Sequence, residues 1–176
     1  MNIFTLHTDP CIAARMQCDK HVVKMPLESA QMLASALRRY GATDIDMPFT
    51  KAGKPYGNSH PHHPCTVWAG DTRNNFTWLC DHGLALCEEY THRYGKSHAC
   101  GHAIRHMIRF SHLIPEGRRT RFVQAMPDEY KIRKAPVIAY RRYYKSDKAE
   151  FATWDKGREA PLWWTQQGAT DENAHV

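Results

Sequence analysis

Apolar residues recur with a helical period over the first forty residues. They are Ile12, Ala13, Met16, Val23, Leu27, Ala30, Leu33, Ala34 and Leu37. Because side chains three and four residues apart share one face of an α-helix, this spacing predicts an amphipathic helix. Asp9 followed by Pro10 is typical of a helix start, and Gly41 of a helix end. Pro26 interrupts the pattern, so we expect either a kink or two abutting helices there.

The same periodicity predicts more helices downstream. One is expected from Asp71, which can cap it, to about Arg93, with Gly95 beyond its end. A third is expected over residues 102–112. Two more are expected to begin near residues 127 and 136, the last of them running towards residue 154.

Residues 42–66 are rich in Gly, Pro, Asn and His, which predicts a long connection rather than a helix or strand. No repeat or composition break requires a second domain. The sequence therefore predicts a mainly α, compact single-domain helical bundle over residues 1–165. A short N-terminal strand is an optional addition to it. The polar residues 166–176 are expected to form a flexible C-terminal tail.

The composition is that of an ordinary globular protein. Hydrophobic residues make up 42% and charged residues 24% of the 176, which argues against a disordered chain. Neither a run of about 18 apolar residues nor a signal peptide is recognisable, so we expect a cytoplasmic protein without membrane spans. The six cysteines contain no CxxC pair and are expected to be thiols.

The charge is unevenly distributed. The chain carries a net +6, and residues 114–145 hold nine Lys or Arg against three acids. Clustered basic charge attracts polyanions, which favours DNA or a nucleotide as the partner. A solvated basic face on a soluble protein would show the same pattern. The residues of this segment predicted to bind substrate are Arg118, Arg119, Arg121, Arg141, Arg142 and Lys145.

Polar side chains are densest at the centre of the first predicted helical region. The candidates for catalysis there are Asp19, Lys20, His21, Lys24 and Glu28. Since His21, Lys24 and Glu28 are spaced by three and four, a continuous helix places them in one row. The row is either a solvent-facing stripe with a Lys24–Glu28 ion pair or part of an active site. In an active site, either lysine would bind phosphate or act as a nucleophile, and the other three groups would transfer protons.

A second group of polar candidates, a cluster of histidines, lies between prolines in the predicted connection. His60 and His63 are expected to close the active site and to be catalytic, because imidazole transfers protons and imidazolium binds phosphate. A divalent metal held by His60, His62, His63 and Cys65 is an alternative. Their spacing matches no strong zinc signature, so no metal ligand is assigned.

Further substrate contacts are predicted on and after the second long helix. These are Asn75, Trp78, Arg93, Lys96 and His98. Interleaved basic and aromatic residues over 140–145 can neutralise phosphates and stack bases. A helix with its tyrosines buried in the core and its arginines outside would have the same sequence.

Several motifs together resemble a small family of uncharacterised proteins frequent in phage genomes. They are Asp9-Pro10, the CDKHVVKM stretch at 18–25, Glu28, His63-Pro64, Trp68, residues 75–79, 88–90, 93–96 and 125–128. The resemblance covers residues 1 to about 164, and CDKHVVKM is its most specific part. It implies a phage-type context, in which DNA or nucleotide chemistry is favoured and the host cytoplasm is the compartment. Pro26 stands where the family pattern has an aliphatic residue.

These observations favour a nucleic-acid or nucleotide modifying enzyme, a transferase or hydrolase that modifies a base or removes a base or phosphate. A metal-dependent phosphoesterase using the histidine loop is a second hypothesis. A non-catalytic, basic nucleic-acid-binding module is a third, and it predicts binding with a steep salt dependence and without a role for His21 or Glu28.

Overall fold

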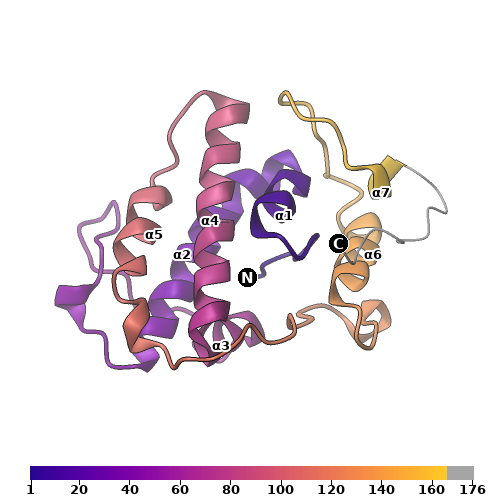
Figure 1. The fold of residues 1–176 in the computed structure, drawn as a ribbon. Helices are drawn as coiled ribbons and strands as arrows, with labels where there is room; N and C mark the ends of the chain where they lie inside the picture. The colour runs from indigo at the N-terminus through magenta and orange to yellow at the C-terminus, as the bar shows by residue number, and fades with distance from the viewer. Residues whose placement is uncertain (166–176) are drawn as a thin grey trace.

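The computed structural model describes residues 1–165, and these form a helical bundle (Figure 1). The α-helices are α1 Pro10–Met16, α2 Asp19–Arg39, α3 Pro64–Asp71, α4 Arg73–Tyr94, α5 Cys100–Ile108, α6 Pro136–Asp147 and α7 Leu162–Thr165. Three 3-10 turns, η1 Asp44–Asp46, η2 Ser111–Leu113 and η3 Asp128–Tyr130, lie in the connections. The predicted mainly α class is confirmed. The optional N-terminal strand is not formed, and the predicted tail, 166–176, lies outside the described residues.

The first helical region is divided at a different place from the one predicted. Asp9 caps α1 by accepting a hydrogen bond from the Ile12 amide at 2.8 Å. The chain then leaves the helix at Gln17, and α2 runs through Pro26 without ending. The break has a tertiary cause. The side-chain amide of the buried Gln17 donates to the Ile3 carbonyl at 3.0 Å, and the backbone amide of Cys18 donates to the Tyr144 hydroxyl at 3.1 Å.

The connection before the second long helix contains a helix that the sequence pattern did not predict. His63 caps α3, which ends at the Asp71 predicted as the cap of the next helix. Thr72 caps α4 instead, accepting a hydrogen bond from the Asn75 amide. Gly95 ends α4 in the left-handed region at φ 65°, as predicted. The helix expected near residue 127 is only the turn η3.

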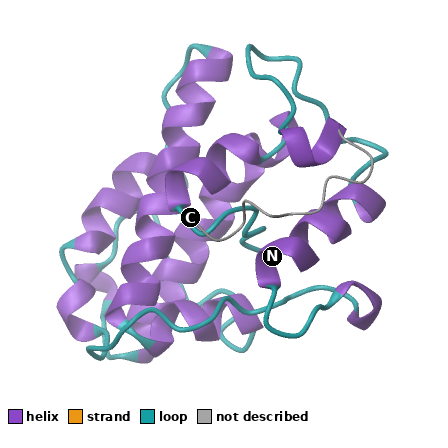
Figure 2. Cartoon of the chain, turned by 45° about the vertical axis from the view of Figure 1, so that its right-hand side comes forward, coloured by secondary structure: helices purple, strands orange, loops and turns teal. Residues whose placement is uncertain are grey.

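Two apolar cores hold the bundle together. The first lies among α2, α3, α4 and α5, with Leu33, Phe76 and Ile104 fully buried. The second joins α6 and the C-terminal segment to the N-terminal arm, residues 1–8. Figures 1 and 2 show α6 and α7 set apart from α1–α5. Because Ile3 packs in the first core and Leu6 in the second, the arm is fixed between the two parts of the molecule.

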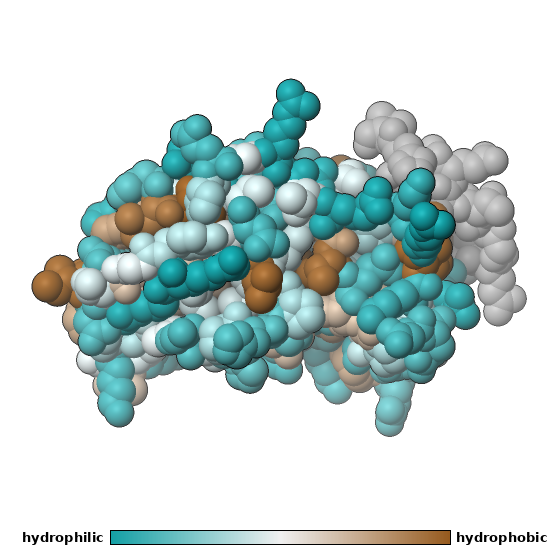
Figure 3. All heavy atoms as spheres, turned by 90° about the horizontal axis from the view of Figure 1, so that it is seen from below, coloured by the Kyte–Doolittle hydropathy of each residue, from teal (hydrophilic) through white to brown (hydrophobic). Residues whose placement is uncertain are grey.

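The surface is mostly polar. Seen from below, apolar side chains lie in separate small patches among hydrophilic ones (Figure 3). No helix within residues 1–165 is both long and apolar enough to cross a membrane. All six cysteines are free thiols.

Acid should unfold this protein well above the range in which its carboxylates titrate. Burial lowers the pKa of His21 and of His82 to about 3, against about 6.5 in an unfolded chain. Between these values the unfolded state binds more protons, so stability is present above pH 6.5 and is lost as the pH falls towards 3. Each histidine contributes about 1.4 kcal/mol per pH unit, so the free energy of unfolding should fall by about 4 kcal/mol between pH 6.5 and 5.

Urea midpoints measured at pH 7.5, 6 and 5 test this expectation. His82→Gln should roughly halve the pH slope, because His82 is one of the two histidines whose pKa burial lowers to about 3. A midpoint that stays constant from pH 7.5 to 5 would contradict the prediction.

Candidate active site at the start of the chain

The N-terminal amine and Glu28 lie side by side, where the N-terminal arm meets α2. The Glu28 side chain is 9% exposed, and one of its oxygens lies 3.8 Å from the Met1 amine and accepts a hydrogen bond from the Asn2 amide at 2.8 Å. The other oxygen lies 3.1 Å from Lys24 Nζ. A nearly buried carboxylate is thus balanced by two amines, one on the N-terminal arm and one on its own helix.

The fold presents the amine end of Met1 to the surface. Its side chain is 3% exposed, and its sulfur accepts a hydrogen bond from the Thr66 hydroxyl on α3. Since the whole residue is only half-buried, the exposed atoms are mainly those of its backbone. Asn2 fixes the arm behind it, because its side-chain amide donates to the Ala125 carbonyl at 2.7 Å.

His63 lies near this pair, and its hydrogen bond at the start of α3 determines which ring nitrogen carries the proton. Its Nδ1 accepts the Cys65 amide at 3.2 Å, so a neutral ring carries its proton on Nε2. Burial lowers the His63 pKa, the charges of the N-terminal amine and His60 lower it further, and only Glu28 opposes them. The ring is therefore a neutral hydrogen-bond donor near both Glu28 and the amine.

The histidine loop is attached to α2 by a pair of hydrogen bonds. Ser35 Oγ donates to the Ser59 carbonyl and accepts the Ser59 amide, both at 2.8 Å. This brings the loop to the helix that carries Glu28. His60 is exposed in the same loop, with φ 53° and its Nδ1 2.9 Å from Ser59 Oγ.

Two of the predicted catalytic residues, Asp19 and His21, lie away from the amine and Glu28. Asp19 is buried, with an ion pair to Arg93 at 2.9 Å and a hydrogen bond from the Asp155 amide at 2.7 Å. His21 packs against Phe4 and Tyr144, about 10 Å of helix rise from Glu28. The structure therefore does not bring Asp19 and His21 together with the amine and Glu28, and their predicted acid–base roles stay predictions.

The two lysines of the predicted catalytic set lie in different surroundings. Lys20 is exposed, with its Nζ 5.1 Å from the centre of the Phe151 ring and away from Glu28. Lys24 points to Glu28 but its side chain is 67% exposed, so it is not the desolvated lysine that a lowered proton affinity requires.

Four predicted substrate-binding residues are buried and hydrogen-bonded within the protein, so their predicted contacts with substrate stay predictions. Arg93 has no exposed side-chain surface and lies between Asp19 and Glu89, 2.9 Å from each. Asn75 is bonded to the Trp68 carbonyl and to Thr120. The other two are Trp78, which donates to the Thr8 carbonyl, and Arg141, which donates to the Leu6 carbonyl.

The remaining predicted contacts are accessible. Lys96, Arg118, Arg119, Arg121, Arg142 and Lys145 are exposed. His98 is half-buried and lies 3.1 Å from the Val23 carbonyl, in a groove that Lys24 also lines. For the metal alternative, residues 1–165 contain no group of three side chains arranged to hold a metal ion.

Sequence reasoning missed the α-amino group entirely. The letter code shows Met1 as one apolar residue, and no periodicity marks its amine as a functional group. A neutral amine can attack electrophilic carbon, so the Met1 amine beside Glu28 is a candidate nucleophile.

Residues 1–101 match the model of the pyrimidine dimer DNA glycosylase family, and the chain belongs to that family. No curated protein and no solved structure matches it. DNA glycosylases remove bases from DNA, so the predicted class of nucleic-acid modifying enzyme is confirmed at this level. The matched range contains Met1, Glu28 and His63, and leaves out the basic segment at 114–145.

Proposed function

We propose that this protein removes a pyrimidine-dimer base from DNA with its N-terminal α-amino group as the nucleophile and Glu28 as the partner carboxylate. The observation that carries the proposal is the 3.8 Å separation of the Met1 amine and the Glu28 carboxylate. Removal of Met1 would not dismantle the pair, because the Asn2 nitrogen lies 2.8 Å from the same carboxylate.

The proposed reaction has two stages. The neutral amine attacks C1′ of the damaged nucleotide, and the electron pair of the bond between base and sugar leaves with the base. The amine gives up a proton to Glu28. The departing base takes a proton from water, while the Nε2–H group of His63 donates a hydrogen bond to that base. Opening of the sugar ring then converts the amine adduct into an imine, which water hydrolyses to release the protein.

The α-amino group suits this role better than the two lysines do. α-Amino groups hold their proton less tightly than lysine side chains, so a larger share of them is neutral at neutral pH. Glu28 also stabilises the positive charge that develops on the sugar and on the nitrogen during attack. Lys24, also close to Glu28, is the second candidate for the nucleophile.

Chemical trapping distinguishes the two amines. A duplex carrying one thymine dimer is incubated with the protein and borohydride, which reduces an imine to a stable amine bond. We expect a covalent protein–DNA complex whose digested peptide carries the sugar on the N-terminal residue, Met1 or Asn2, as an intact mass of the free protein identifies it. Attachment at Lys24 would transfer the role to that residue. Absence of both adduct and base release would contradict the proposed function.

His63→Asn separates the hydrogen-bond-donor role of His63 from its structural role. Asn is as good a helix cap as any residue, so α3 should keep its start and the melting temperature should change little. Loss of the Nε2–H hydrogen-bond donor should lower kcat by about a hundredfold, a typical effect of removing one donor to a group on which charge develops. His63→Ala should lose the cap as well, at a cost of about 1 kcal/mol. Wild-type turnover by His63→Asn would remove His63 from the reaction.

A further inference from the structure

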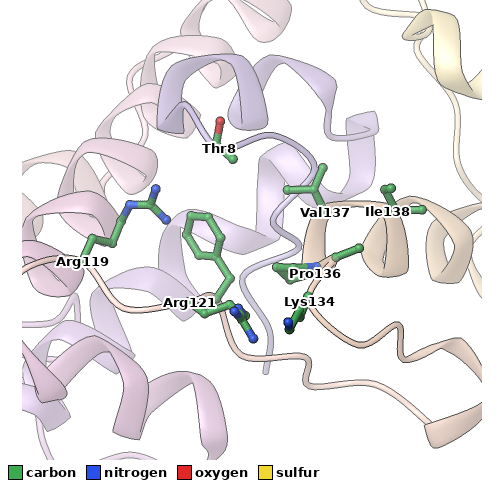
Figure 4. Close-up of a pocket in the computed structure, with 9 residues that line it drawn as sticks. Thr8, Arg119, Arg121, Lys134, Pro136, Val137 and Ile138 are labelled. Atoms are coloured by element: carbon green, nitrogen blue, oxygen red, sulfur yellow. The ribbon is translucent and has the colours of Figure 1, made fainter. Parts of the chain in front are cut away.

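A second concave site lies outside the range that the family model matches. It is a cavity of about 190 Å³ between the start of α6, the end of the N-terminal arm and the segment 119–122. Its apolar wall includes Phe122, Pro136 and Val137. Figure 4 shows Arg119 on one side of it, Arg121 and Lys134 together on another, and Val137 and Ile138 opposite Arg119.

The charge around this cavity is entirely positive. Arg119, Arg121 and Lys134 line it, and no acidic residue does. Within residues 1–165 none of the three cations forms an ion pair with a carboxylate. Arg119 lies over the Phe122 ring at 4.4 Å, which holds a guanidinium at the edge of the apolar wall. The three cations therefore make the cavity attractive to an anion.

The backbone around the cavity adds to its preference for an anion. Lys134 is held at φ 67°, a conformation that costs a non-glycine residue about 1–3 kcal/mol and that gathers at functional sites. The start of α6 lines the same cavity and has no side-chain cap, so the positive end of the helix dipole adds to the positive charge there. An apolar wall of limited size ringed by cations is complementary to a flat aromatic group that carries a phosphate.

We propose that this cavity binds one unstacked nucleotide of the DNA, its base against Phe122 and Val137 and its phosphate on Arg121 and Lys134. A base paired within a duplex cannot enter, so the nucleotide is unpaired or turned out of the stack. The segment that lines the cavity also reaches the candidate active site, since Ala125 bonds to Asn2. Four residues span at most about 14 Å, which places Arg121 within reach of the same DNA molecule.

Fluorescence anisotropy with single-stranded oligodeoxynucleotides tests the site without any base removal. One strand carries all its bases, and a matched strand carries abasic sugars throughout its centre. Wild type should bind the normal strand about tenfold more tightly, because stacking of a base contributes to affinity. Lys134→Gly removes a cation and relieves the strained backbone at the same time, and Arg121→Gln removes a second. Both should reduce this base-dependent advantage to near unity and flatten the salt slope by about 0.7.

Arg142→Gln is the charge-matched control, because Arg142 is exposed and does not line the cavity. It should retain the base-dependent advantage. Equal binding of the normal and abasic strands by wild type would overturn the proposal, as would equal effects of Lys134→Gly and Arg142→Gln. Titration with free deoxynucleoside monophosphates separates the two sources of the ligand, and saturation by these without strand binding would overturn the assignment to DNA. The readout is independent of the amine chemistry, so either proposal can fail alone.

Discussion

Acetylation of the N-terminal amine should abolish base removal, with a loss of at least about a thousandfold in single-turnover rate. An amide nitrogen shares its lone pair with the carbonyl and cannot attack C1′. Addition of one glycine before Met1 should have a similar effect, because the new amine is displaced from Glu28. The Met1 side chain and its contact with Thr66 need not change, so the melting temperature should stay within a few degrees.

Lys24→Met is the control for this experiment. It removes the other amine beside Glu28 while keeping a side chain of similar length, and it should lower the rate by about tenfold at most, as expected of one exposed charge. A blocked chain that still cleaves the glycosidic bond would exclude the α-amino group as the nucleophile. A Lys24→Met variant as inactive as the blocked chain would contradict the assignment of Lys24 to a minor electrostatic role.

Glu28→Gln should lower the rate of base removal by about 10²- to 10³-fold while leaving DNA binding nearly unchanged. The amide oxygen of glutamine still accepts the Asn2 amide hydrogen bond, so the N-terminal arm should remain in place. What is lost is the negative charge that stabilises positive charge on the sugar and the amine. The appropriate measurements are single-turnover rates, anisotropy binding of dimer-containing DNA and a thermal melt.

Glu88→Gln makes the same chemical change at an exposed position of α4 and should leave the rate unchanged. Glu28→Gln that cleaves at the wild-type rate would reduce Glu28 to an anchor of the arm. If it loses rate and DNA affinity in the same proportion, the carboxylate acts on binding and not on the chemical step.

The buried polar residues show why a helical period does not separate candidate substrate contacts from structural ion pairs. Arg93 and Asp19 are 74 positions apart, and each satisfies the charge of the other inside the protein. Arg158 adds two hydrogen bonds to Glu89, 69 positions away, and so attaches the C-terminal segment to α4. A buried charge must be paired, but the helical period cannot show which polar residue of an amphipathic stretch finds its partner elsewhere in the chain.

The local signals were more reliable where the chemistry itself is local. Asp9 before Pro10 and Gly95 after α4 act at the helix ends they were predicted to mark, because a cap uses groups only a few residues apart. His63 before Pro64 is an equally local signal, yet it was interpreted as part of a loop. Pro26 lies inside α2, so the alternative of two helices abutting at that residue is not formed, and the predicted kink stays a prediction. The phage-type resemblance stays a prediction.

By itself the sequence determined the helical class, the concentration of basic charge at 114–145 and the candidacy of Glu28 and His63, because period, composition and residue type depend on no distant partner. Only the tertiary structure decided that the chain's first amine meets Glu28, that Asp19 and Arg93 pair with each other, and that Arg119, Arg121 and Lys134 surround one cavity. Each of these depends on which distant segments pack together, and that is determined by the shape and burial of the two apolar cores.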